Sequence, residues 1–238
     1  LFLNKSNAKY YHYISYLLIF SCSLVGLHWI YNSLFVVGNL PFLLSVFSTG
    51  LLAFYVAAFY IVALVLSRLY AFSSLEIASI ITAVELLRSL LFSGFPWLEI
   101  GVLGVNLPIS KFAPFLGSYG VTFLIVLCTA TLVNNFNLRS VFKVSSLVLI
   151  SLLVGLINLT DEVKDPIKIL LVQGGIPQLI KFDPDHELEV QKKYYSLIKT
   201  ATSNEGKIEA IVLPETALIR PLEFTDKAFL KKLSSLIA

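Results

Sequence analysis

The stretch NLTDEVKDP, residues 158–166, marks an abrupt change in the composition of the chain. Residues 1–163 hold 7 of the 18 Lys and Arg and 5 of the 15 Asp and Glu, and residues 164–238 hold the rest. In the whole chain 57% of residues are hydrophobic, only 14% are charged and the mean hydropathy is +0.82. A soluble domain carries about 25% charged residues. The composition therefore predicts a transmembrane domain over residues 1–163 and a water-exposed domain over residues 164–238.

Five apolar stretches of the first part are long enough to cross a bilayer, whose hydrocarbon core of about 30 Å needs about 20 apolar residues in a helix. They are residues 13–36, 42–67, 74–93, 113–134 and 141–159. Because lipid offers the backbone no hydrogen-bond partner, we expect each stretch to be an α-helix. Lys and Arg near the ends of spans favour the cytoplasmic side, which here holds Lys5, Lys9, Arg68, Arg139 and Lys143. We therefore expect residues 160–238 to lie on the outer, periplasmic side.

Charged residues inside the third predicted span have two interpretations. Glu85 and Arg88 lie three residues apart on one helical face, a spacing that allows a salt bridge. Charges within a membrane commonly mark a functional site. Alternatively, the two side chains pair with each other near the outer interface and only hold the helix in place.

The stretch LLFSGFPWLEIGVLGVN, residues 90–106, does not have the polar composition of an ordinary connection between spans. It combines Gly, Pro and aromatic residues around Glu99, which is typical of a re-entrant or interfacial segment. Trp97 is of the type expected at the depth of the lipid headgroups. We interpret the stretch as a lipid-access loop in which Pro96 and Trp97 contact substrate. The alternative is an aromatic anchor without chemistry.

The last 75 residues alternate between strand and helix patterns. PIKILLVQGGIP, residues 166–177, is a buried-strand pattern that ends at Gly-Gly, and GKIEAIVLPE, residues 206–215, predicts a second strand. A helix is predicted after each strand. The first has Asp183 as its N-cap and buries Val190, Tyr194, Leu197 and Ala201; the second has Thr225 as its cap and buries Phe229, Leu230, Leu233 and Leu236. This order predicts an α/β domain with a parallel sheet.

Glu215 directly follows Pro214 at the end of the second predicted strand. Open α/β sheets carry their sites at the carboxyl ends of their strands. On this geometry alone Glu215 is either a catalytic acid or base, or an exposed acidic residue of a loop.

Several motifs in one order carry a resemblance that bears on this choice. VQGGIPQ, KFDPD and LPETA, between residues 172 and 217, resemble the start of a carbon–nitrogen hydrolase domain of the nitrilase type. Together with ELLRSLLFSGFPWLEIG and APFLGSYGVTFLI, and with LHWIYNSLF and LSRLY, they are similar to the apolipoprotein N-acyltransferases. The resemblance runs from about residue 15 to residue 220. One departure is Phe182, which stands where the family usually has a Trp.

The resemblance implies a fold and a reaction. The fold is a multi-span helical membrane domain followed by an α-β-β-α sandwich, of which these residues hold only the start. Because the sequence contains no methionine and stops within the last predicted helix, we expect an internal fragment. Because two of the three triad residues would lie outside it, we expect this fragment to be inactive. Of the family's Glu–Lys–Cys triad, Glu215 matches the Glu, and the Lys and Cys would lie beyond residue 238. Phe182 would retain an aromatic contact with substrate but lose the Trp N–H.

The implied reaction is acyl transfer in a bacterial inner membrane. A Cys thiolate takes a fatty acyl chain from a phospholipid, and the α-amine of a diacylglyceryl-Cys apolipoprotein receives it, with Glu215 as general base. The expected partners are these two lipid substrates, the expected state is a monomer, and neither a cofactor nor a metal is expected. The net charge of +3 is too small and dispersed to indicate a nucleic-acid partner.

Alternatives remain at this point. A membrane-tethered amidase or nitrilase acting on small substrates would share the setting of Glu215 but would need no lipid-access loop. A non-enzymatic transporter or scaffold would explain the spans only. Cys22 and Cys128 lie inside predicted spans and are interpreted as inert. His28 and Trp29 are interpreted as interfacial packing residues.

Overall fold

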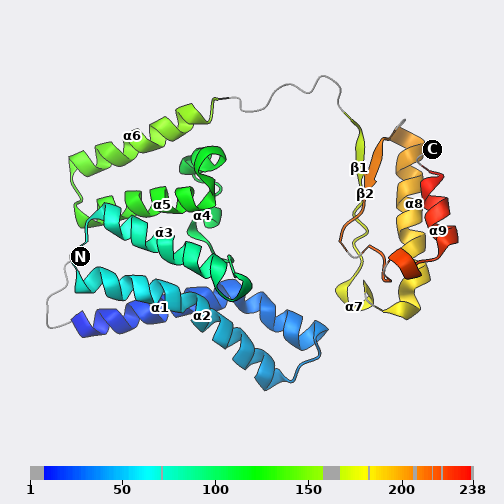
Figure 1. Cartoon of the computed structure of the whole chain (residues 1–238), viewed down its shortest axis with the longest axis horizontal. Coiled ribbons are helices and arrows are strands. Elements are labelled where there is room, and N and C mark those ends of the chain that lie inside the picture. The colour runs from blue at the N-terminus through cyan, green and yellow to red at the C-terminus, as the bar shows by residue number, and fades with distance from the viewer. Residues whose placement is uncertain are drawn as a thin grey trace. The chain divides into compact units, whose positions relative to one another are not determined.

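The computed structural model describes residues 8–70, 72–157, 167–181, 183–205, 208–215, 217–220 and 222–236. The chain divides into two compact units, Leu1–Thr160 and Asp161–Ala238. The first unit is helical, and the second combines helices with a small sheet (Figure 1).

The first unit consists of α1 (Ala8–Asn32), which continues as a π-helical segment over Ser33–Val37, α2 (Phe42–Leu69), α3 (Ser74–Leu90), α4 (Ile100–Leu103), α5 (Ala113–Asn134) and α6 (Leu138–Val154). Short 3₁₀ segments, Leu91–Ser93 and Pro108–Phe112, flank α4. Local capping explains where two helices begin. Ser73 and Glu76 form a reciprocal capping box at α3, and the Asn137 side chain accepts a hydrogen bond from the Ser140 N–H at α6.

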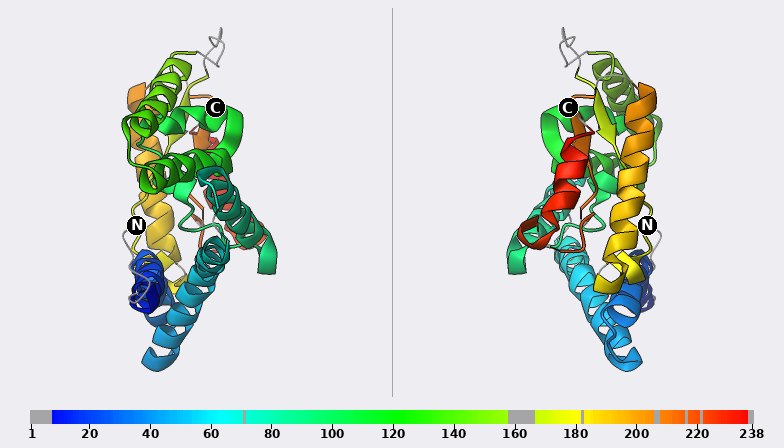
Figure 2. Two further views of the ribbon diagram at one scale, coloured as in Figure 1. Left: turned by 90° about the vertical axis from the view of Figure 1, so that its left-hand side faces the viewer. Right: turned by 90° about the vertical axis from the view of Figure 1, so that its right-hand side faces the viewer.

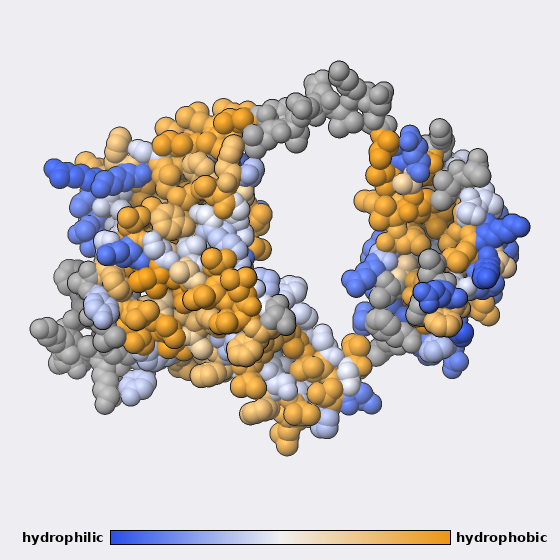
Figure 3. Space-filling view, in the orientation of Figure 1, coloured by the Kyte–Doolittle hydropathy of each residue, from blue (hydrophilic) through white to orange (hydrophobic). Residues whose placement is uncertain are grey.

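Within the described residues, three segments are long and apolar enough to cross a membrane: Tyr13–Val37, Phe42–Leu66 and Pro108–Asn134. They contain most of the first, second and fourth predicted spans. Residues 74–90 of the third predicted span form α3, and residues 141–154 of the fifth lie in α6. These two helices have 17 residues each, and their crossing of the membrane stays a prediction. Hydrophobic residues cover much of the surface of this unit (Figure 3), which is the surface expected of a protein embedded in lipid.

The second unit consists of β1 (Ile169–Leu171), α7 (Gln178–Lys181), a 3₁₀ segment (Pro184–His186), α8 (Glu187–Glu205), β2 (Ala210–Val212), a 3₁₀ segment (Leu222–Phe224) and α9 (Lys227–Ser234). The two strands pair in parallel, with Leu170 opposite Ile211, which confirms the predicted order and pairing. Helices α8 and α9 lie on the same face of the sheet (Figures 1 and 2). The core between them includes Val172, Val190, Tyr194, Ile198 and Ala217.

Two details of the second unit differ from the sequence predictions. Leu197 was expected in the core but is 38% exposed, because the buried stripe of α8 turns to Ile198, which is 1% exposed. Thr225 is buried and its hydroxyl donates to the carbonyl of Arg220, so it does not cap α9. The cap is Asp226, whose side chain accepts the Ala228 N–H.

Candidate functional site

Helix α3 carries two charged side chains that are almost completely buried in the first unit. Glu85 and Arg88 are each 1% exposed. Among the described residues they form no ion pair with each other, so the interpretation that they pair is wrong. Both side chains instead bind the backbone of the segment between α3 and α5. Glu85 accepts a hydrogen bond from an N–H group of this segment, and Arg88 donates to two of its carbonyl groups.

Glu85 accepts three hydrogen bonds, which is close to full satisfaction for a buried carboxylate. Its Oε1 accepts from the Tyr60 hydroxyl and, at 3.0 Å, from the backbone N–H of Ile100. Its Oε2 accepts from the Thr122 hydroxyl at 2.7 Å. The Thr122 oxygen in turn accepts the N–H of Gly101 at 2.8 Å. One carboxylate therefore joins α2, α3, α5 and the start of α4.

Arg88 binds the backbone of the loop that precedes α4, residues 91–99. Its Nη1 donates to the carbonyl oxygen of Phe95 at 2.8 Å and to that of Trp97. The Phe95 N–H donates back to the carbonyl of Arg88 at 3.3 Å, and the guanidinium lies 5.8 Å from the centre of the Tyr60 ring. Arg88 Nε is buried without a hydrogen-bond partner in the described part of the chain. The guanidinium thus fixes two carbonyl groups on either side of Pro96.

The loop needs these attachments because several of its residues have unusual backbone conformations. Phe92 and Leu98 have φ values of 52° and 63°, which non-glycine residues rarely adopt. Gly94 has φ of 82°, and a Cβ there would lie 2.2 Å from the carbonyl oxygen of Ser89, so only glycine fits.

The aromatic side chain predicted to contact substrate lies on the open side of this loop. Trp97 is 53% exposed, and its ring centroid lies 5.3 Å from that of Trp29 on α1. Pro96 is also exposed. Trp29, interpreted as an interfacial packing residue, therefore packs against Trp97 itself, and the two tryptophans of the chain form one exposed aromatic pair.

Glu99 is the third charged side chain of this region and is 5% exposed. Its Oε1 has no hydrogen-bond partner among the described residues. Buried polar groups are nearly always satisfied, often by water. Glu99 Oε1 is therefore an acceptor to which a water molecule could donate a hydrogen bond.

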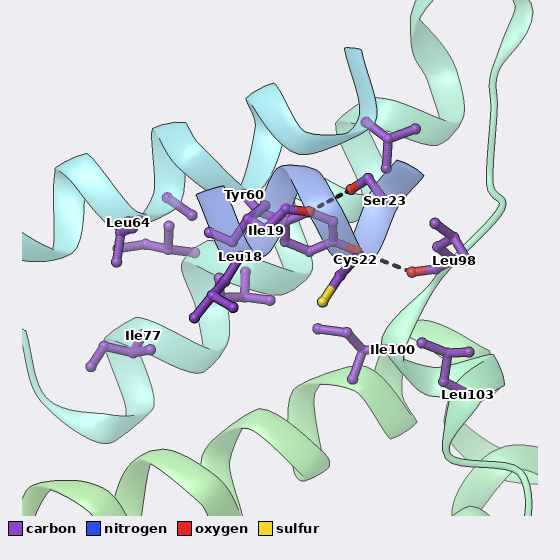
Figure 4. A pocket seen from close by; sticks show the side chains of 14 residues that line it. Leu18, Ile19, Cys22, Ser23, Tyr60, Leu64, Ile77, Leu98, Ile100 and Leu103 are labelled. Atoms are coloured by element: carbon purple, nitrogen blue, oxygen red, sulfur yellow. Dashed lines mark hydrogen bonds between the residues drawn. The ribbon is translucent and has the colours of Figure 1, made fainter. Parts of the chain in front are cut away.

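An apolar cavity of about 490 Å³ lies beside the network, within the size range of small-molecule sites. Side chains of α1, α2, α3 and α4 and of the loop point into it (Figure 4). They include Leu18, Cys22, Tyr60, Ile77, Leu98 and Leu103. None of the described lining residues is charged. Such a cavity can accept a hydrocarbon chain, and its described lining offers no charged side chain to pair with a charged head.

The second unit carries the predicted catalytic acid at one edge of its sheet. Glu215 is exposed and lies three residues after Val212, the last residue of β2. Leu171 at the end of β1 is opposite Val212. The exposed Gln173 therefore leaves the same edge of the sheet as Glu215. Phe182, the remaining predicted contact, lies outside the described residues.

Two side chains near this edge have shifted pKa values. Hydrogen bonds from the Asp185 N–H and from His186 hold the pKa of Asp183 below its ordinary value, and this carboxylate begins the 3₁₀ segment before α8. Burial raises the pKa of Tyr194, whose ring packs against Gly174 just after β1. A Cβ at Gly174 would lie 2.5 Å from the ring, so the close contact between this backbone and α8 requires glycine.

In the described part of the chain, thiols and potential metal ligands are not gathered at either place. Cys22 and Cys128 are free cysteines on α1 and α5. Across the described residues no group of three His, Cys, Asp or Glu side chains could hold a metal ion.

The sequence did not indicate Tyr60, Thr122 or the Trp29 contact as parts of the site. Tyr60 and Thr122 lie in the middle of apolar stretches, where a lone hydroxyl has no distinctive spacing. The usable signal was Glu85 itself, because a buried carboxylate requires donors from neighbouring helices.

Comparisons with known proteins agree with one another. Residues 1–131 match the model of the apolipoprotein N-acyltransferase N-terminal domain. Similar curated proteins, each named apolipoprotein N-acyltransferase, include those of Haemophilus ducreyi (31% identity, 90% of this chain and 43% of the relative) and Haemophilus influenzae (33%, 81% and 39%). That of Coxiella burnetii is 30% identical over 81% of this chain and 42% of its own length. The chain thus spans less than half the length of these relatives.

Proposed function

The chain belongs to the apolipoprotein N-acyltransferase family, and we propose that it forms the membrane body and the first part of the catalytic domain of such an enzyme. The proposed reaction transfers a fatty acyl chain from a membrane phospholipid to the α-amine of a diacylglyceryl-Cys apolipoprotein. The observation that carries this proposal is the family match over residues 1–131, in a unit that has three segments able to cross a membrane.

The proposed chemistry proceeds in two half-reactions. A Cys thiol loses its proton to Glu215, and the thiolate attacks the ester carbonyl of the phospholipid. The ester C–O bond breaks, and the departing lysophospholipid oxygen takes up the proton. In the second step the amine of the acceptor attacks the thioester, an amide forms, and the Cys leaves as thiolate. Glu215 removes the amine proton and returns it to the sulfur.

The placement of Glu215 supports its proposed role. It follows β2 at the carboxyl edge of a parallel sheet, the edge at which α/β domains carry their sites. The nucleophile is not proposed among Cys22 and Cys128, because both lie on helices of the membrane body. The resemblance puts the Cys and the Lys of the triad after residue 238.

We further propose that the second unit is the start of a nitrilase-like sandwich on the periplasmic side of the inner membrane. The outer face of its sheet supports a further layer, since Ile169, Leu171 and Val212 are 45%, 75% and 48% exposed. Parallel sheets are normally covered on both faces. The distribution of Lys and Arg supports the orientation.

Residues 90–106 are proposed as the lipid-access loop, with Pro96 and Trp97 as substrate contacts. Phe182 is proposed as a further substrate contact. Both described contacts are exposed, and the apolar cavity lies beside the loop. An aromatic pair such as Trp29 and Trp97 suits the level of the ester groups of a bilayer.

An assay of the reaction products tests the proposal. The full-length protein that contains these residues is given a phospholipid with a labelled acyl chain and a diacylglyceryl-Cys peptide. The proposal predicts labelled N-acyl peptide and lysophospholipid in equal amounts, with little free fatty acid. Release of free fatty acid without peptide acylation, or turnover of small soluble amides instead, would favour the membrane-tethered amidase.

A further inference from the structure

Two charged residues one turn apart in α3 fasten the loop that carries Trp97. Arg88 holds the carbonyl oxygens of Phe95 and Trp97, and Glu85 holds the N–H of Ile100. The Trp97 side chain lies between these attachments and is half exposed. We infer that Glu85 and Arg88 are positioning residues that hold Trp97 in the orientation in which it contacts the lipid substrate, an inference that rests on the proposed function of the loop.

The backbone of the loop gives these attachments a specific task. Leu98, the residue after Trp97, has a positive φ of 63°, and Phe92 has one of 52°. L-residues adopt this conformation reluctantly when nothing holds them there. Without the donors and acceptors of α3, Leu98 would relax toward an ordinary conformation, and the adjoining Trp97 ring would turn away from its present direction.

The neighbours of Trp97 also favour one orientation. Leu98 packs closely on α1, where a Cβ at Gly26 would lie 2.5 Å from it. The Trp29 and Phe95 rings lie 5.3 and 6.3 Å from the Trp97 ring. These contacts depend on the loop being held against α1 and α2, and Glu85 and Arg88 hold it from the side of α3.

The bonds of Arg88 distinguish positioning from simple helix packing. Both acceptors of its Nη1 are main-chain carbonyls of the loop, two residues apart. Lysine at this position keeps the charge but offers a single ammonium on a differently shaped stem in place of the planar guanidinium. Arg88→Lys is therefore expected to weaken the hydrogen bonds to the Phe95 and Trp97 carbonyls while keeping a positive charge at this position.

A double-mutant cycle between Arg88 and Trp97 tests the inference. Acyl transfer by the full-length protein is measured for Arg88→Lys, Trp97→Ala and the double variant, with kcat and KM for the phospholipid determined separately. Arg88→Lys alone is expected to lower kcat/KM about 10- to 100-fold, the size of effect that a small misplacement near a substrate produces. In the Trp97→Ala background the same substitution is expected to cost less than about 2-fold, because nothing remains to be positioned.

The outcomes of the cycle separate two failures. If Trp97→Ala leaves acyl transfer unchanged, the proposed role of the loop is wrong and the inference falls with it. If Trp97→Ala is costly but Arg88→Lys has the same effect in both backgrounds, or none in either, only the inference is overturned. Arg139→Lys, an exposed substitution on α6, is the matched control and is expected to leave both constants unchanged.

A spectroscopic readout keeps the inference testable if Arg88→Lys lowers the yield of folded protein. Trp29→Phe leaves Trp97 as the only tryptophan among residues 1–238, so a change in tryptophan emission caused by a substitution at Glu85 reports the loop. In this background Glu85→Gln, which retains one carbonyl acceptor, is expected to shift the emission less than Glu85→Ala does. Identical spectra for the protein with Glu85 intact and for the Glu85→Gln and Glu85→Ala variants would contradict the inference.

Discussion

The hydroxyl of Thr122 on α5 donates a 2.7 Å hydrogen bond to the carboxylate of Glu85 on α3, and both residues are almost fully buried. The same hydroxyl oxygen accepts the N–H of Gly101 at 2.8 Å. One threonine therefore satisfies a buried charge and the first turn of α4 together. In a unit made mainly of apolar helices, this polar contact specifies how α3, α4 and α5 meet.

Thr122→Val is expected to destabilise the first unit, because valine keeps the shape but leaves Glu85 Oε2 and the Gly101 N–H without their partner. The expected loss is about 1–2 kcal/mol in the free energy of unfolding. Titration with SDS in mixed micelles measures it. Thr129→Val on the same helix is the control, since Thr129 is exposed and bonds only the carbonyl of Ile125. Equal effects of the two substitutions would contradict the role given to Thr122.

Gly101→Ala is expected to force α4 away from α5. A Cβ at Gly101 would lie 2.0 Å from the carbonyl oxygen of Ser118 and 3.0 Å from Thr122 Oγ1. Overpacking of this kind costs about 1–3 kcal/mol, and the same SDS titration measures it. In contrast, Gly50→Ala on α2 meets nothing within 4 Å and should leave stability unchanged or raise it by up to about 1 kcal/mol. A stable Gly101→Ala protein would show that α4 is not held as tightly as described.

Local signals were sufficient to predict much of the fold. Each of the five apolar stretches forms a helix, and the strand–helix–strand–helix order gives the parallel pairing of β1 and β2. Asp183 was correctly expected to begin a helical segment, because a carboxylate followed by Pro is a strong start signal. Such features depend on residues a few positions apart.

Partners distant in sequence could not be predicted in the same way. The spacing of Glu85 and Arg88 suggested a pair, but Glu85 binds Tyr60 and Thr122, which lie 25 and 37 residues away. Nothing in the local pattern distinguishes these hydroxyls from others within apolar stretches. Asp226 rather than Thr225 caps α9, because the Thr225 hydroxyl donates its hydrogen bond to the carbonyl of Arg220. The roles of Glu215, Trp97, Pro96 and Phe182 stay predictions.

Asp183 provides a pH-dependent prediction for the second unit. Its pKa in the folded protein is lowered, mainly by the Asp185 N–H and by His186, relative to about 3.9 in an unfolded chain. A lowered carboxyl pKa contributes stability that is present above the unfolded pKa and is lost as the pH falls through the folded pKa. The stability that Asp183 adds relative to Asp183→Ala should therefore be present above about pH 4 and be lost only as the pH falls below about 4.

Chemical denaturation at a series of pH values, followed by the circular dichroism of the full-length protein, measures this difference. A difference that already declines between pH 7 and 5 would show that another group controls the start of α8.

The central claim is that Glu215 at the end of β2 is the general base of acyl transfer. The most direct measurement compares transfer of a labelled acyl chain from phospholipid to a diacylglyceryl-Cys peptide by full-length wild type, Glu215→Gln and Glu223→Gln, at equal amounts in the membrane. Glu223 is an exposed acid of the same unit and serves as the control. The account predicts that Glu215→Gln lowers the rate about 10²- to 10⁴-fold while Glu223→Gln leaves it unchanged. Turnover by Glu215→Gln at the wild-type rate would contradict it.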